Sequence, residues 1–240
     1  MPSKLKPDLG LFAQRTFVLV VGCFGLIWAV ANFARGATVE EFRNVQDRLL
    51  QFETFNQAAA TRMLESPASS YIGACDYHAQ RALLLLEVPL ADATLRSGAV
   101  RDFDRHMQSI EQRSKQVLAC APRDPLIWIL LFGTDVEYGR LDGHSFDLLA
   151  TSYEISPNEA WIAMRRVTVA IPVVLAAPEP MRQKILTEFQ QLVRHRFVEI
   201  PARSYLSAPA SVRALLQLRI DELDPQSRTL FSEVLEKLRS

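Results

Sequence analysis

Few of the residues that could do chemistry lie at the spacings that chemistry requires. The four histidines, His78, His106, His144 and His195, occur outside any zinc-binding helix motif, and no Gly-x-Ser-x-Gly nucleophile elbow is present. Cys75 and His78 have the Cys-x-x-His spacing of half a metal site, but no second Cys/His pair accompanies them. We therefore predict that the chain has no catalytic residue, no metal site and no cofactor.

Cys75 and Cys120 are the two cysteines that could form a disulfide. Cys23 lies within a strongly apolar run, where it would behave as a small hydrophobic residue. An oxidising compartment would allow Cys75 and Cys120 to pair, and closing that loop of about 46 residues would stabilise the fold by roughly 4 kcal/mol. The sequence leaves open whether they form this disulfide or remain two buried thiols.

Arg165 and Arg166 are candidate binding residues, because they interrupt the apolar stretch 160–177. Burying an unpaired guanidinium is costly, so at least one of them is expected to pair with an acid or to face a concave surface. The two interpretations are a salt bridge between neighbouring helical hairpins and an arginine that reads a ligand. The acids available for pairing are Glu137, Asp142 and Glu154.

A basic region lies between residues 182 and 219, where seven Lys/Arg stand against two Asp/Glu. The helix expected over 181–197 has an apolar inner face, which leaves Arg182, Arg194 and Arg196 to project elsewhere. These arginines form either a solvated helix face or a contact surface. The partner of such a surface would be anionic lipid headgroups, an acidic glycan or an acidic protein.

The elements that position these residues begin with an apolar run over residues 17–34, in which only Gly22, Gly25 and Asn32 fall outside the hydrophobic set. As a helix this run would span about 27 Å, close to the hydrocarbon thickness of a bilayer. We predict an uncleaved membrane anchor. The alternatives are a signal peptide cleaved near Ala31 and a buried core helix. An anchor or a signal peptide would place the rest of the chain outside the cytoplasm.

Beyond the anchor, the sequence predicts helices throughout and no convincing strand, which makes the chain all-α. A weakly amphipathic stretch over 38–64 would form a stalk, and residues 102–121 have a clear helical period. Asp124, Ser156 and Asp224 each have a side chain that can cap a helix, and each is followed directly by a proline, which indicates three helix starts. Ser156 also fits a capping box. The later helices are expected in pairs: roughly 125–139 with 143–155, 157–176 with 178–198, and 208–222 with 225–239.

Helix pairs of 30 to 40 residues are the sequence signature of an α-solenoid. The stretch 117–161 resembles the tetratricopeptide repeat. It has Trp128 near the family's aromatic position, Leu131 near its leucine, Gly139 near its turn glycine, Leu148 near its second-helix apolar residue and Pro157 near its closing proline. His144 stands where the family has a small alanine, and Pro172 interrupts the next unit, so the repeat is degenerate. The resemblance implies stacked hairpins that bind other proteins. Trp128 and Trp161 would be repeat-core residues, or alternatively sugar-stacking platforms.

The predicted organisation has four parts. They are a cytoplasmic tail over 1–16, a transmembrane signal anchor over 17–34, a stalk helix and first helical segment over 35–97, and a tetratricopeptide-like helical domain over 98–240. The phrases APRDPLIW and SYEISPNEAWIAMRR add a fainter resemblance to small anchored proteins encoded among bacterial exopolysaccharide or O-antigen genes.

These features predict a single-pass protein of the bacterial inner membrane with its C-terminal domain in the periplasm. That domain would be a scaffold that binds other membrane or periplasmic proteins, as an accessory factor in envelope polysaccharide biosynthesis or export. The alternatives are a periplasmic glycan-acting enzyme, whose carboxylates can be far apart in sequence, and a purely structural membrane spacer.

The composition excludes two further classes of protein. The 240 residues include 27 Lys+Arg and 27 Asp+Glu, and this neutral balance argues against a nucleic-acid binder that relies on bulk positive potential. A hydrophobic share of 49% with 22% charged residues argues against a disordered chain.

Overall fold

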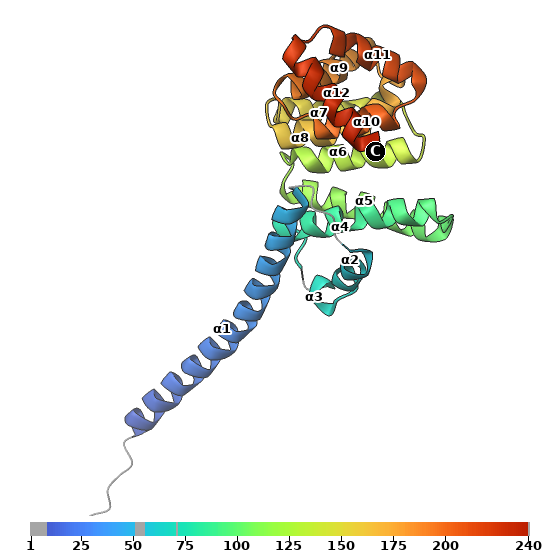
Figure 1. Cartoon of the computed structure of the whole chain (residues 1–240). Helices are drawn as coiled ribbons and strands as arrows, with labels where there is room; N and C mark the ends of the chain where they lie inside the picture. The colour runs from blue at the N-terminus through green and yellow to red at the C-terminus, as the bar shows by residue number, and fades with distance from the viewer. Residues whose placement is uncertain (1–8, 51–55, 71, 240) are drawn as a thin grey trace, which may run out of the picture.

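The chain is all-α in its computed structural model, as the sequence predicts (Figure 1). The backbone is described for residues 9–50, 56–70 and 72–239, without the side chains of residues 9–13, 31–39, 68 and 70. Residues 1–8 of the predicted tail and 51–55 of the predicted stalk segment therefore lie outside the described residues. The described residues form twelve α-helices and one 3-10 helix, and they form no strand.

The helices follow one another with short connections. In chain order they are α1 (Leu9–Leu50), α2 (Gln57–Leu64), α3 (Pro67–Ser70), α4 (Tyr77–Arg96), α5 (Val100–Cys120), α6 (Pro125–Glu137), α7 (Gly143–Ile155), α8 (Ala160–Ala170), the 3-10 helix η1 (Ile171–Ala176), α9 (Glu179–Arg194), α10 (Glu199–Ser207), α11 (Ala210–Asp221) and α12 (Pro225–Arg239).

Helix α1 has two parts with different surroundings. Over residues 17–30 it exposes ten large apolar side chains, each between 53% and 70% exposed. Near its C-terminal end, Phe42, Val45 and Leu49 are buried, because this part of α1 packs against α4. Figure 1 shows the first part of α1 extending away from helices α2–α12, which we call the helical body. The stretch predicted as a stalk, 38–64, is therefore not described as one helix: α1 ends at Leu50 after packing on the body from Phe42 onward, and α2 begins at Gln57.

The backbone of α1 is helical through the predicted anchor and into the predicted stalk. Among the described residues, however, no helix is found to be long and apolar enough to cross a membrane. The predicted anchor over 17–34 extends past residue 30, where the described side chains of this part of α1 end, and it stays a prediction.

Helices α4 and α5 pack against each other as a hairpin. Gly98 lies in the connection with a φ of 73°, a left-handed conformation that glycine adopts without strain. At the opposite end of the hairpin, a disulfide joins Cys75, just before α4, to Cys120, the last residue of α5, with 5.4 Å between the Cα atoms. Of the two states that the sequence left open, the disulfide is therefore the one present. Both cysteines lie at the surface.

Local capping explains the starts of α6 and α12. The Asp124 carboxylate accepts a hydrogen bond from the backbone N–H two residues on, and Asp224 from the N–H three residues on, at 3.1 and 3.0 Å. The third predicted start is wrong. Ser156 ends α7, and α8 begins only at Ala160, because the Ser156 carbonyl is held by a hydrogen bond from the Arg166 side chain.

The predicted helix pairs are found in part. Helix α6 packs on α7, and α8 packs on α9, but η1 interrupts the helix predicted over 157–176, at Pro172. The last predicted pair is wrong, since α12 packs mainly on α10, and α11 on α9. The short helix α10, absent from the predicted pairs, explains the difference: the Phe231 ring of α12 lies 5.8 Å from Tyr205 of α10 and 6.1 Å from Phe189 of α9.

Candidate functional site

Arg166 is the most deeply buried charged residue of the helical body. Its side chain is 0% exposed and lies on α8, between α7 and α9. The guanidinium donates from Nε to the Glu188 carboxylate at 2.9 Å, and from Nη1 to the carbonyl oxygens of Ser152 and Ser156 at 3.2 and 3.0 Å. Arg166 thus ties α9 to the C-terminal end of α7, where helix carbonyls have no partners of their own.

Tyr153 completes this network. Its ring centroid lies 4.2 Å from the Arg166 guanidinium carbon, and its hydroxyl donates to Glu188 at 2.9 Å. Burial raises the pKa of Tyr153 well above its usual value. Burial also raises the pKa of Glu188, against the opposing effect of the Arg166 hydrogen bonds and charge. Because Arg166 and Tyr153 occupy both oxygens of Glu188, this carboxylate holds helices together and has no free position for a reacting group.

The sequence predicted the type of contact at Arg166 but not the partner. Of the two interpretations, the salt bridge is present, yet it uses Glu188 and none of the acids Glu137, Asp142 and Glu154. The packing of α8 on α9 brings Glu188 beside Arg166 across 22 residues of sequence. An acid directly before the buried Phe189 was the available signal for this partner.

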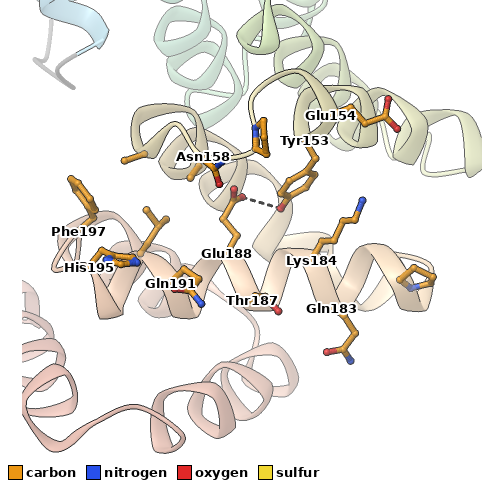
Figure 2. Close-up of a pocket in the computed structure, with 15 residues that line it drawn as sticks. Tyr153, Glu154, Asn158, Gln183, Lys184, Thr187, Glu188, Gln191, His195 and Phe197 are labelled. Carbon is orange, nitrogen blue, oxygen red and sulfur yellow. Dashed lines mark hydrogen bonds between the residues drawn. The ribbon is translucent and has the colours of Figure 1, made fainter.

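An open pocket of about 820 Å³ lies beside this network, between the α7–α8 connection and α9. Figure 2 shows Tyr153 and Glu188 in its wall, joined by their hydrogen bond. Glu154 and Lys184 lie toward one end of the view, and His195 and Phe197 toward the other. The remaining polar lining includes Asn158, Gln183, Thr187 and Gln191. We call this the α7–α9 pocket.

Arg165 points to the other side of α8 and reaches helix α1. Its guanidinium donates to the carbonyl oxygen of Leu49 at 2.6 Å, and burial lowers its pKa to about 10. A cation at the C-terminal end of a helix satisfies its carbonyls and complements the helix dipole. Arg165 therefore fastens the end of α1 to the body. Since 116 residues separate the two partners, no local pattern could have predicted the contact.

A second hollow, of about 650 Å³, runs between the α4–α5 hairpin and helices α6 and α8. Its lining is largely apolar and includes Val88, Pro89, Phe103, Met107, Leu130, Gly133, Val136, Val169 and Pro172. Its charged lining residues are Asp92, Arg96, Glu137 and Arg165. Partial burial and the charge of Asp92 raise the pKa of Glu137. We call this the apolar groove.

Trp128 and Trp161 are not brought together at either hollow. The Trp128 indole donates to the Pro122 carbonyl at 2.9 Å. The Trp161 indole donates to Glu159 at 2.9 Å, and its ring packs beside the Arg81 guanidinium at 5.3 Å. Neither tryptophan is among the lining residues of the α7–α9 pocket or of the apolar groove.

The three arginines of the basic region have different surroundings. Arg182 donates to Glu179 at 3.1 Å and to the carbonyl oxygen of Ala177 at 3.0 Å, so it closes the start of α9. Arg194 and Arg196 are exposed at the other end of α9, and Arg196 has a φ of 68°, where the chain leaves the helix. Arg182 therefore does not join Arg194 and Arg196 in one surface.

Together, the fold and these sites define an all-helical protein with one long apolar-faced helix and a body that carries a polar pocket and an apolar groove. Among the described residues, no group of three or more His, Cys, Asp or Glu side chains could hold a metal ion. Comparisons of the chain with protein-family models, with curated proteins and with solved structures find no match.

Proposed function

We propose that the protein is a membrane-anchored helical scaffold that binds other proteins through its body. One observation carries this proposal: α1 exposes a continuous apolar surface over residues 17–30, and the same helix then buries Phe42, Val45 and Leu49 in the body. A large exposed apolar surface on one helix favours a membrane or partner environment over water. A bilayer around residues 17–34 would hold the body at a fixed distance from the membrane surface.

The disulfide supports placing the body outside the cytoplasm. The Cys75–Cys120 bond lies at the surface, where cytoplasmic reductants would reach it, and such bonds persist in oxidising compartments such as the periplasm. We therefore propose a single-pass protein of the bacterial inner membrane with a periplasmic body of tetratricopeptide-like hairpins. A role beside envelope polysaccharide synthesis or export follows from the sequence resemblance alone.

Alkaline extraction of membranes tests the anchor. Replacing Leu19, Phe24 and Ile27 by lysine in the full chain puts three charges on exposed positions of α1. Each lysine near the centre of a bilayer costs about 3 kcal/mol, so the triple variant should move from the membrane pellet to the soluble fraction.

The matched control carries three lysines on exposed apolar positions of the body, at Leu95, Val100 and Leu218, and should stay in the pellet. A triple α1 variant that also stays in the pellet would refute the anchor. A reporter that works only outside the cytoplasm, fused after Ser240, should be active, and its inactivity would refute the orientation. The mass of the mature chain separates an anchor from a cleaved signal peptide.

A further inference from the structure

The α7–α9 pocket is deepened by small side chains on α8. Ala160 and Ala163 lie three residues apart, on one face of α8, and both line the pocket. Their side chains end at the Cβ atom, so this wall stands back from α9. Opposite, the lining follows α9 from Pro180 to Leu192, a length of about 18 Å. The pocket is therefore a long hollow, and its volume of about 820 Å³ lies in the range of small-ligand sites.

The charges in the pocket lining cancel. With His195 counted as neutral at pH 7, the charged side chains there are Glu154, Lys184 and Glu188. Arg166 neutralises Glu188 through their buried ion pair. Glu154 and Lys184 carry one charge of each sign, and both are exposed toward the same end of the pocket (Figure 2). An ionised ligand would find no excess of the opposite charge, so the lining favours an uncharged one.

Three neutral side chains supply hydrogen-bonding groups at the pocket. They are Asn158 on the α7–α8 connection and Thr187 and Gln191 on α9. None of the three side chains bonds to another described residue, whereas Gln183 of the same lining donates to Glu179 at 2.7 Å. Amides and hydroxyls can both donate and accept hydrogen bonds. A ligand that carries several hydroxyl groups could therefore bond to all three.

Phe197 adds an exposed aromatic ring at one end of the pocket. Of the six phenylalanines described in the helical body, five are buried and Phe197 is 44% exposed. The backbone N–H groups of Arg196 and Phe197 donate to the carbonyls of Val193 and Leu192 at 3.0 and 2.9 Å, a Schellman motif that ends α9. The motif holds Phe197 where Figure 2 shows it, beside His195. A flat apolar ring near neutral polar groups suits a ligand with an apolar face and a polar edge.

Sugars fit this lining better than peptides do. An extended peptide binds along an exposed strand edge, and the described residues form no strand. An amphipathic helix requires a continuous apolar groove, whereas Lys184, Thr187 and Gln191 interrupt the α9 wall. A sugar ring has apolar C–H faces and a rim of hydroxyls. These two surfaces complement the Phe197 ring and the neutral polar side chains.

We propose that the α7–α9 pocket binds an uncharged oligosaccharide, with one sugar ring stacked on Phe197 and hydroxyls bonded to Asn158, Thr187 and Gln191. The lining along α9 is longer than one ring, which favours a short chain of sugars over a single one. Binding involves no chemical step. It gives the proposed scaffold a second kind of ligand, and it rests on the pocket alone, not on the membrane anchor.

Saturation-transfer difference NMR tests the proposal on the full chain in nanodiscs of neutral lipid. The probes are three uncharged tetrasaccharides: maltotetraose, cellotetraose and mannotetraose. Tetragalacturonate and a blocked Ala-Ser-Ala-Ser peptide represent charged sugars and peptides, and empty nanodiscs serve as the blank. At least one uncharged tetrasaccharide should give a signal that saturates on titration. Tetragalacturonate and the peptide should bind at least about tenfold more weakly than that sugar.

Two substitutions, each with a matched control, locate the binding site. Phe197→Leu keeps an apolar side chain but removes the flat ring, and should weaken binding about tenfold. Tyr77→Leu removes an exposed aromatic ring outside the pocket and should leave the affinity unchanged. Gln191→Ala removes one amide and should weaken binding about fivefold, whereas Gln112→Ala, at an exposed position of α5, should have no effect.

A third substitution, Ala160→Phe, should abolish the signal by filling the hollow. Should it lower the melting temperature, Phe197→Leu, at an exposed position, replaces it. Three results would overturn the inference: no saturable signal from any of the uncharged tetrasaccharides, a signal that Phe197→Leu and Gln191→Ala leave unchanged, and tighter binding of tetragalacturonate or of the peptide.

The outcome for the pocket is separable from the outcome for the anchor, because membrane extraction does not involve the pocket. Sugar binding by a chain that fails to stay in the membrane would refute only the anchor. A chain that stays in the membrane and binds no sugar would refute only the pocket.

Discussion

Removal of Glu188 tests whether the buried Arg166 network holds the body together. Glu188→Leu leaves the guanidinium, which is 0% exposed and cannot lose its proton, without an acid partner. Its hydrogen bonds to the Ser152 and Ser156 carbonyls and to the Ser152 hydroxyl remain, as does the contact with the Tyr153 ring. Breaking one side of a buried ion pair costs about 3–5 kcal/mol. Since two carbonyl partners remain, we expect a loss near the lower end, about 3 kcal/mol of the free energy of unfolding.

The opposite substitution should cost less. Arg166→Met leaves Glu188 beside the open α7–α9 pocket, where its side chain is 10% exposed and keeps the Tyr153 hydrogen bond. This carboxyl can become neutral by taking a proton, a route that the guanidinium lacks. The double variant removes both charges, so its loss should fall below the sum of the two single losses by about 2 kcal/mol.

Urea unfolding of the full chain, followed by far-ultraviolet circular dichroism, measures all three variants. The matched control is the exposed pair Arg203 and Glu199 on α10, whose charges are 59% and 67% exposed, and whose removal should cost less than about 0.5 kcal/mol. The reasoning is refuted if Glu188→Leu costs no more than this control, or if the two single losses simply add.

Three further predictions concern single features of the body. Gly133→Ala should raise the free energy of unfolding by about 0.5–1 kcal/mol, because alanine favours the interior of α6 and its Cβ finds room; a loss in urea unfolding would contradict this. Replacing Cys75 and Cys120 by serine should lower the free energy of unfolding by about 4 kcal/mol, since the two cysteines are 45 positions apart and their disulfide closes the whole loop between them. Reductant should then have no effect on the variant. Hydrogen bonds from Ser227 hold the pKa of Asp224 below its usual value. The stability that the charged Asp224 side chain gives to the fold is therefore complete above its unfolded-state pKa of about 3.9, and it is lost as the pH falls through the lower folded-state pKa. The stability of Asp224→Asn, measured by acid unfolding, should lack this dependence on pH. An acid-unfolding profile identical to that of the unsubstituted chain would contradict the prediction.

The elements that the sequence predicted correctly are those fixed by nearby residues. Asp124 and Asp224 cap the helices that follow them, because a cap needs only a side-chain oxygen within three residues of a free N–H. Ser156 has the same local pattern, yet Arg166 takes its carbonyl and α8 starts later. A local signal therefore fails where a buried side chain ten residues further along the chain bonds to the same backbone carbonyl.

The contacts that define the candidate sites could not be predicted, because they join distant parts of the chain. Arg166 pairs with Glu188 only once α8 lies on α9, and Arg165 reaches Leu49 only once α1 packs on the body. The sequence identified the two arginines as costly to bury, which is a property of one residue. It could not identify their partners, which depend on the packing of whole helices.

Pro172 shows how packing changes the interpretation of one residue. In sequence it predicts only that a repeat unit is interrupted, which is a defect of the α-solenoid pattern. In the structure Pro172 lies with Pro89 and Gly133 around one hollow, although 83 residues separate the two prolines. A defect in one helix needs no function, since packing elsewhere can offset it. Pro172 lies in the first turn of η1, where proline is tolerated, so only Pro89 and Gly133 lie in helix interiors beside this hollow. The α7–α9 pocket beside Arg166 has its buried charges already paired.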